Sequence, residues 1–229
     1  MRTLLISSLP RFAENLMLAL ENLDESWQVR WQSTLPTVLH AELLLLASPQ
    51  NPSFMAELFA HPPLPSAYLL TLGASSSRAD ICLPADTPLA QIVLAAQELS
   101  RMNTLPLLAR SALLDLIPRA EALLREMGLK STLRAAAFLP EMIAVCAACP
   151  WLLDGVTQRL YPLIGQSRAM QPAAVERSVR SALDSLWRSG SLSALEKWFG
   201  HTVDPEKGRP TNREFLALMA EHVRDTRQS

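Results

Sequence analysis

The sequence predicts two domains of different class, a small α/β domain with a parallel sheet followed by an all-α domain. In residues 1–100, short and continuously apolar runs alternate with segments of helical periodicity, a pattern typical of a parallel sheet covered on both faces. From residue 119 onward only helical periodicity remains. The chain has 229 residues, enough for two compact domains of roughly 100–150 residues each.

The first hundred residues contain five short segments with the pattern of strands and three with the pattern of helices. We expect helices over Arg11–Leu23, Phe54–Phe59 and Thr87–Leu99, the last with Asp86 as its N-cap. The eight residues between the last two strands are fewer than the dozen that a crossover helix needs. The expected strands are Thr3–Ile6, Trp27–Trp31, Leu43–Ala47, Tyr68–Leu72 and Ile81–Leu83.

This order of elements, together with Ile81-Cys82-Leu83-Pro84 before the last helix, resembles the receiver domain of bacterial response regulators. The resemblance implies a flavodoxin-like sheet, here shortened, over residues 1–101. An unrelated small α/β domain is the alternative interpretation.

The residues that carry receiver chemistry are not matched. Ser7 and Ser8 follow the first strand, where receivers place the acidic residues that hold Mg²⁺. Ser48, or Ala47 in a slipped register, stands at the position of the phosphate-accepting aspartate, and Leu83 replaces the lysine before the proline. Without carboxylates, no hard oxygen cage and no aspartyl phosphate can form. We therefore expect a pseudo-receiver with neither a phosphorylation site nor a bound metal.

Residues 102–117 are expected to be a partly helical linker, and residues 118–229 a second domain of six helices. A Gly/Ser-rich composition, typical of flexible tethers, is absent from the linker. Thr211 and Glu214 have the spacing of a capping box. The six expected helices are Ala120–Met127, Thr132–Cys149, Asp154–Gly165 with an interruption at Tyr161-Pro162, Pro172–Gly190, Ser191–Phe199 and Thr211–Arg224.

The third and fourth of these helices have the dimensions of a helix-turn-helix. In residues 172–190 one side is apolar, whereas Glu176, Arg177 and Arg180 gather on the other. Arginine can donate to both O6 and N7 of guanine, and a carboxylate can accept from the N4 amine of cytosine, so this face suits a DNA major groove. The alternative is an amphipathic surface helix in which Glu176 and Arg180 form an i,i+4 ion pair.

Several motifs in the C-terminal half occur together in one known family. They are Leu160-Tyr161-Pro162, Val175-Glu176-Arg177-x-x-Arg180, Trp187-x-x-Gly190, Phe199-Gly200-x-Thr202-Val203, Lys207-x-Arg209-Pro210-Thr211-Asn212 and Glu214-Phe215. Over roughly residues 118–226 the chain resembles the DNA-binding domain of the sporulation master response regulator (stage zero sporulation transcription factor A) of endospore-forming bacteria. The resemblance implies a six-helix domain that binds short DNA boxes as tandem dimers and activates or represses transcription, behind a receiver.

The resemblance also implies which residues contact DNA. Glu176, Arg177 and Arg180 match base-reading positions, and Arg168, Lys207, Arg209 and Asn212 are the further expected contacts. Two departures stand out, since Ala174 replaces a basic residue of the family and Ser181 replaces a histidine. Fewer phosphate contacts weaken binding, and a lost base contact relaxes specificity by roughly 1–3 kcal/mol. We therefore expect recognition of a box that differs from the usual one.

Composition narrows the possible partners and chemistry. The formal net charge is −1, but residues 1–127 hold 8 basic against 12 acidic residues and residues 128–229 hold 13 against 10, so an anionic partner is expected at the C-terminal half. Three cysteines give no disulfide framework. Cys146-Ala-Ala-Cys149 has redox spacing but lies in an Ala-rich helical segment, where a core role is expected. No apolar run approaches the roughly 20 residues of a membrane span.

The sequence thus favours a sequence-specific DNA-binding transcriptional regulator with a pseudo-receiver that cannot be phosphorylated. The alternative is a protein-interaction module that kept the fold and lost productive DNA recognition. We expect no catalytic site, cofactor or metal. The expected partners are double-stranded DNA, a second copy of the chain on that DNA, and a protein at the pseudo-receiver, in a bacterial cytoplasm and at the nucleoid.

Overall fold

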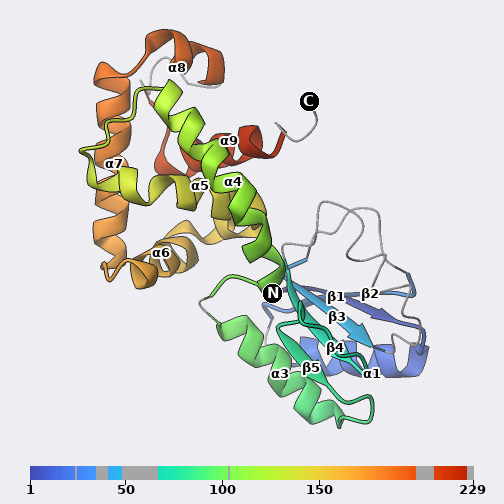
Figure 1. The fold of residues 1–229 in the computed structure, drawn as a ribbon. Coiled ribbons are helices and arrows are strands. Elements are labelled where there is room, and N and C mark those ends of the chain that lie inside the picture. Colours follow the sequence, from blue (N-terminus) through green and yellow to red (C-terminus); the bar gives the residue numbers. More distant parts are fainter. Residues whose placement is uncertain (24, 35–40, 48–66, 103, 200–208, 226–229) are drawn as a thin grey trace. The chain divides into compact units, whose positions relative to one another are not determined.

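A computed structural model describes residues 1–23, 25–34, 41–47, 67–102, 104–199 and 209–225. The chain divides into two compact units, Met1–Ser111 and Ala112–Ser229. The first holds a parallel sheet with helices and the second is helical (Figure 1). The predicted fold classes are confirmed.

The sheet of the first unit is entirely parallel, with the strand order β2-β1-β3-β4-β5. This is the strand order of flavodoxin-like and receiver folds. All five predicted strands are present, three of them with the predicted bounds. The strands are β1 (Arg2–Ser7), β2 (Gln28–Gln32), β3 (Leu43–Ala47), β4 (Tyr68–Leu72) and β5 (Ile81–Leu83).

Two helices, α1 (Pro10–Glu21) and α3 (Leu89–Arg101), pack on each other on one side of the sheet (Figure 1). Residues 73–80, between β4 and β5, contain no helix, as their length predicts. Asp86 is not the N-cap of α3, contrary to the prediction. The cap position is held by Pro88, whose ring presets the backbone torsion, and no side chain caps the helix. The predicted helix at residues 54–59 lies outside the described residues.

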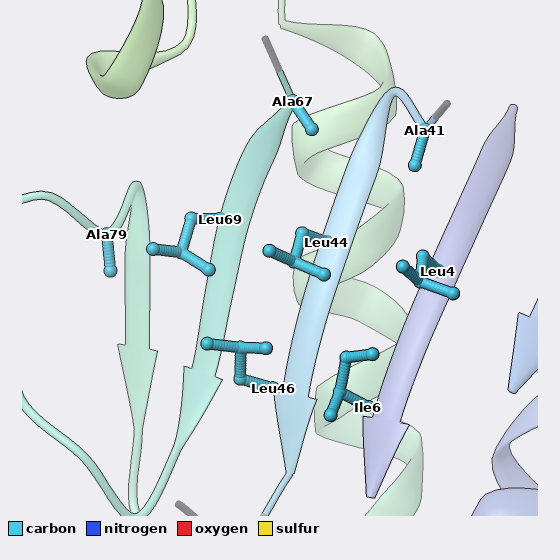
Figure 2. Packing of buried hydrophobic residues seen from close by; sticks show 8 residues of the cluster. All are labelled: Leu4, Ile6, Ala41, Leu44, Leu46, Ala67, Leu69 and Ala79. Carbon is cyan, nitrogen blue, oxygen red and sulfur yellow. The ribbon is translucent and has the colours of Figure 1, made fainter. Parts of the chain in front are cut away.

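The core of this unit follows from the register of the strands. Leu4, Leu44 and Leu69 are aligned across β1, β3 and β4 and point to one face of the sheet (Figure 2). Their neighbours Leu5 and Leu45 point to the opposite face, and all five side chains are buried. Burial on both faces explains why these strands are continuously apolar rather than alternating. The cluster in Figure 2 is completed by Ile6, Ala41, Leu46, Ala67 and Ala79.

Two side chains of the first unit bind residues at the start of helix α4 (Leu107–Glu126), and these residues belong to the same unit. The Asp80 carboxylate accepts hydrogen bonds from the backbone N–H groups of Leu69, at 2.8 Å, and of Leu107, at 3.0 Å. The Tyr68 hydroxyl donates to the carbonyl oxygen of Thr104 at 2.5 Å. Burial raises the pKa of the Asp80 carboxyl above its ordinary value of 3.8, although the two N–H donors oppose the rise.

Among its described residues the second unit contains most of α4 and five further α-helices: α5 (Leu139–Ala148), α6 (Tyr161–Ser167), α7 (Pro172–Ser189), α8 (Leu192–Phe199) and α9 (Asn212–Asp225). Helix α4 begins inside the predicted linker 102–117 and continues past Pro118. The exposed Pro118 lies opposite a buried face that includes Leu116, Ala120 and Leu124. This apolar face keeps the segment helical although proline removes one backbone hydrogen bond.

Two predicted helical segments are divided where prolines start new turns, the first unexpectedly and the second at the predicted interruption, Tyr161-Pro162. The segment 132–149 divides into η1 (Arg134–Ala137), a 3-10 turn, and α5, which has Pro140 in its first turn. The segment 154–165 divides into the end of η2 (Pro150–Gly155), a π-helical turn η3 (Val156–Leu160), and α6, which has Pro162 in its first turn. Proline lacks an N–H and is favoured at such starts.

Helix α5 is the centre of this unit, because its residues 142–147 are all buried and it packs on α9. Within the described residues no single helix is long and apolar enough to cross a membrane. Helix α5 and residues 150–167 pass that test only as a pair bent by 115°.

Candidate DNA-binding surface

Helices α6 and α7 form a helix-turn-helix whose connection is short and closely packed. The Met170 N–H donates to the carbonyl oxygen of Gly165 at 2.8 Å, and the Arg168 N–H donates to that of Ile164 at 3.2 Å. Ala169 has a φ of 50°, in the left-handed region. A Cβ on Gly165 would lie 2.5 Å from the Met170 carbonyl oxygen. The turn therefore requires glycine at position 165.

Helix α7 has the predicted buried side and the predicted start, and it ends at Ser189, one residue before the predicted end. It begins at Pro172, and the Gly190 N–H closes its last turn on the Leu186 carbonyl oxygen at 2.8 Å. At about 100° per residue, Arg177 lies opposite the middle of the buried side. The residues of that buried side are Val175, Val179, Ala182, Leu183 and Leu186.

The three predicted base-reading residues differ in their surroundings. Arg177 is exposed, and no hydrogen bond or ion pair joins it to the part of the chain that the structure describes. In contrast, Arg180 donates to Glu176 at 2.5 Å in an i,i+4 ion pair. The pair expected for a plain surface helix is therefore present, while Arg177 is available for an external partner.

The other predicted contacts are engaged within the domain. Arg168 pairs with Glu141 at the start of α5. Arg209 pairs with Asp184 of α7, with 2.8 Å between Nε and Oδ1. Lys207 lies outside the described residues.

Asn212, also predicted to contact DNA, connects three helices. Its side-chain amide donates to the hydroxyl oxygen of Tyr161 in α6 at 3.1 Å and to the carbonyl oxygen of Glu176 in α7 at 3.4 Å. Burial raises the pKa of the Tyr161 phenol above 10.0, so the hydroxyl is neutral near pH 7. Asn212 therefore ties the start of α9 to both helices of the motif.

Two hollows flank the N-terminal half of α7. One, of about 470 Å³, is lined by charges of both signs, among them Asp154, Glu176, Arg180, Arg209 and Arg213. The other, of about 240 Å³, is lined by Leu133, Arg134, Ala174, Arg177, Ser178 and Ser181. Arg134 was not singled out by sequence analysis, because it belongs to none of the motifs and its neighbourhood arises only from the packing of η1 on α7.

The C-terminal end of α7 is fixed by aromatic residues from the quoted motifs. The Trp187 ring meets that of Phe199 edge-on at 4.9 Å, and the rings of Phe199 and Phe215 stack at 5.8 Å. The predicted capping box is also present, since the Thr211 N–H donates to Glu214 at 2.8 Å and the Glu214 N–H donates to the Thr211 hydroxyl at 3.3 Å.

Residues 120–223 match the family described as Sporulation initiation factor Spo0A C terminal. The helical unit is a Spo0A C-terminal domain. This is a family of DNA-binding transcription factors rather than of enzymes, so the predicted resemblance is confirmed. Within the Spo0A-type domain, the matched motifs serve two purposes. Trp187, Phe199 and Phe215 build the core, while Arg177 lies on the surface.

The α/β unit lies outside the matched range and is described by its own residues. At the end of β1 the Ser7 side chain is buried, and its hydroxyl oxygen accepts a hydrogen bond from the Leu9 N–H at 3.1 Å. Ser48, at the predicted aspartate position, lies outside the described residues. Among the residues that are described, no group of three histidine, cysteine or acidic side chains is placed to hold a metal ion.

Cys146 and Cys149 are buried thiols in and just after α5. Burial raises the pKa of Cys146 to about 12 and also raises that of Cys149. Redox and metal chemistry require the thiolate, so both residues fit the core role predicted for them.

Proposed function

We propose that this chain is a sequence-specific DNA-binding transcriptional regulator in which α7 enters the major groove with Arg177 at its centre. The observation that carries the proposal is the unpaired Arg177 guanidinium at the middle of the exposed side of a helix-turn-helix. Such a fork can donate to O6 and N7 of one guanine, a contact that contributes roughly 1–3 kcal/mol of discrimination. Membership of the helical unit in a family of DNA-binding transcription factors supports the same function.

The Glu176–Arg180 pair has a different role from Arg177. To donate to a base or phosphate, Arg180 must exchange its carboxylate partner for the new acceptor. Once released, Glu176 can accept from the N4 amine of cytosine. We infer that Arg180 and Glu176 contribute to sequence choice only where both find partners, whereas Arg177 contributes to every specific complex. The proposed contacts of Arg168, Arg209 and Asn212 are subject to the same competition with internal partners, and Lys207 completes the set.

We further infer that the α/β unit is a pseudo-receiver. Serine at positions 7 and 8, leucine at 83 and serine at 48 supply neither the carboxylates that hold Mg²⁺ nor the aspartate that takes a phosphoryl group. Incubation of the full chain with acetyl phosphate and Mg²⁺ is expected to leave its mass unchanged. A stable phosphoryl adduct on residues 1–111 would refute this part of the proposal.

The second candidate function is a protein-interaction module without productive DNA recognition. It is favoured by the internal pairing of Arg168, Arg180 and Arg209 and by the short side chains of Ala174 and Ser181. For the DNA-binding function we expect a homodimer on DNA in a bacterial cytoplasm, by likeness to the family, with a protein partner at the pseudo-receiver as the source of regulation.

Selection of the full chain against a random DNA library, followed by anisotropy titration of the enriched sequence, tests the two functions. Arg177→Ala is expected to weaken specific binding at least tenfold, the equivalent of about 1.4 kcal/mol. Arg177→Lys keeps the charge and loses the fork, so it should lose discrimination while retaining most of the salt dependence. Arg125→Ala on α4, an exposed arginine outside both hollows, is the matched control. Failure to enrich any sequence at low salt would leave the interaction module as the function.

A further inference from the structure

The smaller hollow beside α7 differs from the larger one in the sign of its charges. Arg134 and Arg177 line it together with the hydroxyl-bearing Ser178 and Ser181, and its described lining includes no acidic residue. The larger hollow, in contrast, includes the carboxylates of Asp154 and Glu176. Of the two hollows beside α7, the smaller one therefore offers an anion positive charge without a carboxylate next to it, as far as the described residues are concerned.

Arg134 is held at this hollow by a buried neighbour rather than by an ion pair. The turn η1 packs on α7 through the buried Ala135, and the Ala136 N–H donates to the Leu133 carbonyl oxygen at 3.0 Å. The Arg134 side chain is exposed and has no hydrogen-bond or ion-pair partner within the described part of the chain. Within the described residues, the positive charge of Arg134 is therefore not neutralised by a carboxylate, and the same is true of Arg177.

The short side chains of α7 leave room between these two arginines. Ala174 ends at Cβ, and Ser181 carries only a hydroxyl, so neither fills the hollow of about 240 Å³. Ser178 points its hydroxyl back to the Ala174 carbonyl oxygen at 2.8 Å. A phosphate group could enter here, accept from Arg134 through its planar guanidinium, and leave Arg177 directed at the bases.

We propose that Arg134 binds a phosphate of the DNA backbone at the edge of the major groove, and so supplies the positive charge that Ala174 lacks on α7. This inference rests on the proposed function and adds to it a contact from outside the helix-turn-helix. A contact to a phosphate positions the protein without selecting a base.

The test is titration of the full chain, and of its Arg134→Ala variant, with the enriched duplex and with a scrambled duplex between about 50 and 200 mM salt. Loss of one phosphate contact should reduce the slope of log K against log salt by about 0.9. Affinity should fall roughly tenfold for both duplexes, since a hydrogen bond to a charged group is lost. Arg134→Lys should retain most of the slope. Arg125→Ala again serves as the control for the loss of one positive charge.

A second variant separates a missing contact from a disturbed fold. Ala174→Arg in the Arg134→Ala background places a guanidinium on α7 beside the same hollow and is expected to restore the salt slope. If Arg134→Ala binds both duplexes like the parent while Arg177→Ala is weakened, the phosphate contact is refuted and the proposed function stands. If the parent binds neither duplex, the proposed function itself fails. A loss confined to one base position, with the slope unchanged, would make Arg134 a base-reading residue and overturn the proposal.

Discussion

Substitution of Gly165, in the turn between α6 and α7, is expected to change the free energy of unfolding through two opposing contributions. In Gly165→Ala the added methyl would lie 2.5 Å from the carbonyl oxygen of Met170, well inside the separation that real Cβ atoms keep. The turn must open by several tenths of an ångström to relieve the contact. The opening stretches the hydrogen bond from Met170 to residue 165, now 2.8 Å, and the one from Arg168 to Gly165, now 3.3 Å.

The expected cost of the substitution is the balance of the two contributions. Alanine is better than glycine in a helix by up to about 1 kcal/mol. Overpacking of a tight contact costs about 1–3 kcal/mol, and the weakened backbone bonds add to it. We expect a net loss of about 1–2 kcal/mol in the free energy of unfolding of the helical unit. DNA affinity should fall as well, because the turn sets the placement of α7 relative to α6.

Urea unfolding followed by far-UV circular dichroism measures this loss. Gly155→Ala is the matched control, because its methyl would meet only the flexible Arg159 side chain at 3.3 Å, and it should leave the unfolding midpoint within error or raise it slightly. If Gly165→Ala were as stable as the parent and bound DNA equally well, the reasoning from the close approach at Met170 would be wrong.

Three further predictions concern other sites. Near pH 8, iodoacetamide should label only Cys82 in the native chain, because burial raises the pKa values of the Cys146 and Cys149 thiols; mass spectrometry should show one adduct, rising to three in urea. Asn212→Ala should destabilise the helical unit by about 1–2 kcal/mol, since it removes the donor shared by Tyr161 and Glu176; an unchanged midpoint would contradict this. The pKa of Asp80 is raised in the folded state, so the stability that this group adds is present below pH 3.8 and is lost as the pH rises through the raised pKa. The stability of the parent relative to Asp80→Asn should therefore decrease over that rise, and a difference independent of pH would refute the assignment.

The hydrophobic pattern was sufficient to predict those strands that are short apolar runs and those helices that have one clearly apolar side. The strands Leu43–Ala47 and Tyr68–Leu72 were predicted with their observed bounds because each is a short, mainly apolar run between polar or proline-rich segments. Helix α7 was predicted for a similar reason, since Pro172 and Gly190 mark its ends and its buried residues recur at helical spacing.

Several predicted helix bounds in the C-terminal half differ from the observed ones near prolines. Residues 102–117 were predicted as a partly helical linker; helix α4 begins within them and continues through Pro118, because this proline is on the exposed side. Pro140 starts a new helix inside a segment that was predicted as continuous, whereas the break at Tyr161-Pro162, where α6 begins, was predicted. A single sequence does not say which face of a helix a proline occupies, and this decides between a break and a tolerated bend.

For the proposed contact residues on α7, the sequence predicted the side of the helix on which they lie and left open whether Glu176 and Arg180 form an ion pair. Glu176, Arg177 and Arg180 were all expected on one side of α7, but only the packed structure distinguishes the paired Arg180 from the unpaired Arg177. Arg134 was beyond sequence reasoning, because its place beside α7 depends on the packing of η1 across nearly forty positions of the chain.

The internal ion pairs of Arg168, Arg180 and Arg209 affect how the copies of such a regulator would be distributed in a cell between its specific DNA box and non-specific DNA. A genome offers about 10⁶–10⁹ competing sites of arbitrary sequence, and attraction to them comes from cations that neutralise phosphates. An arginine that already has a carboxylate partner gains little by exchanging it for a phosphate at a random site. Fewer copies would then be held on irrelevant DNA, and a small population of the protein would suffice to keep its own box occupied.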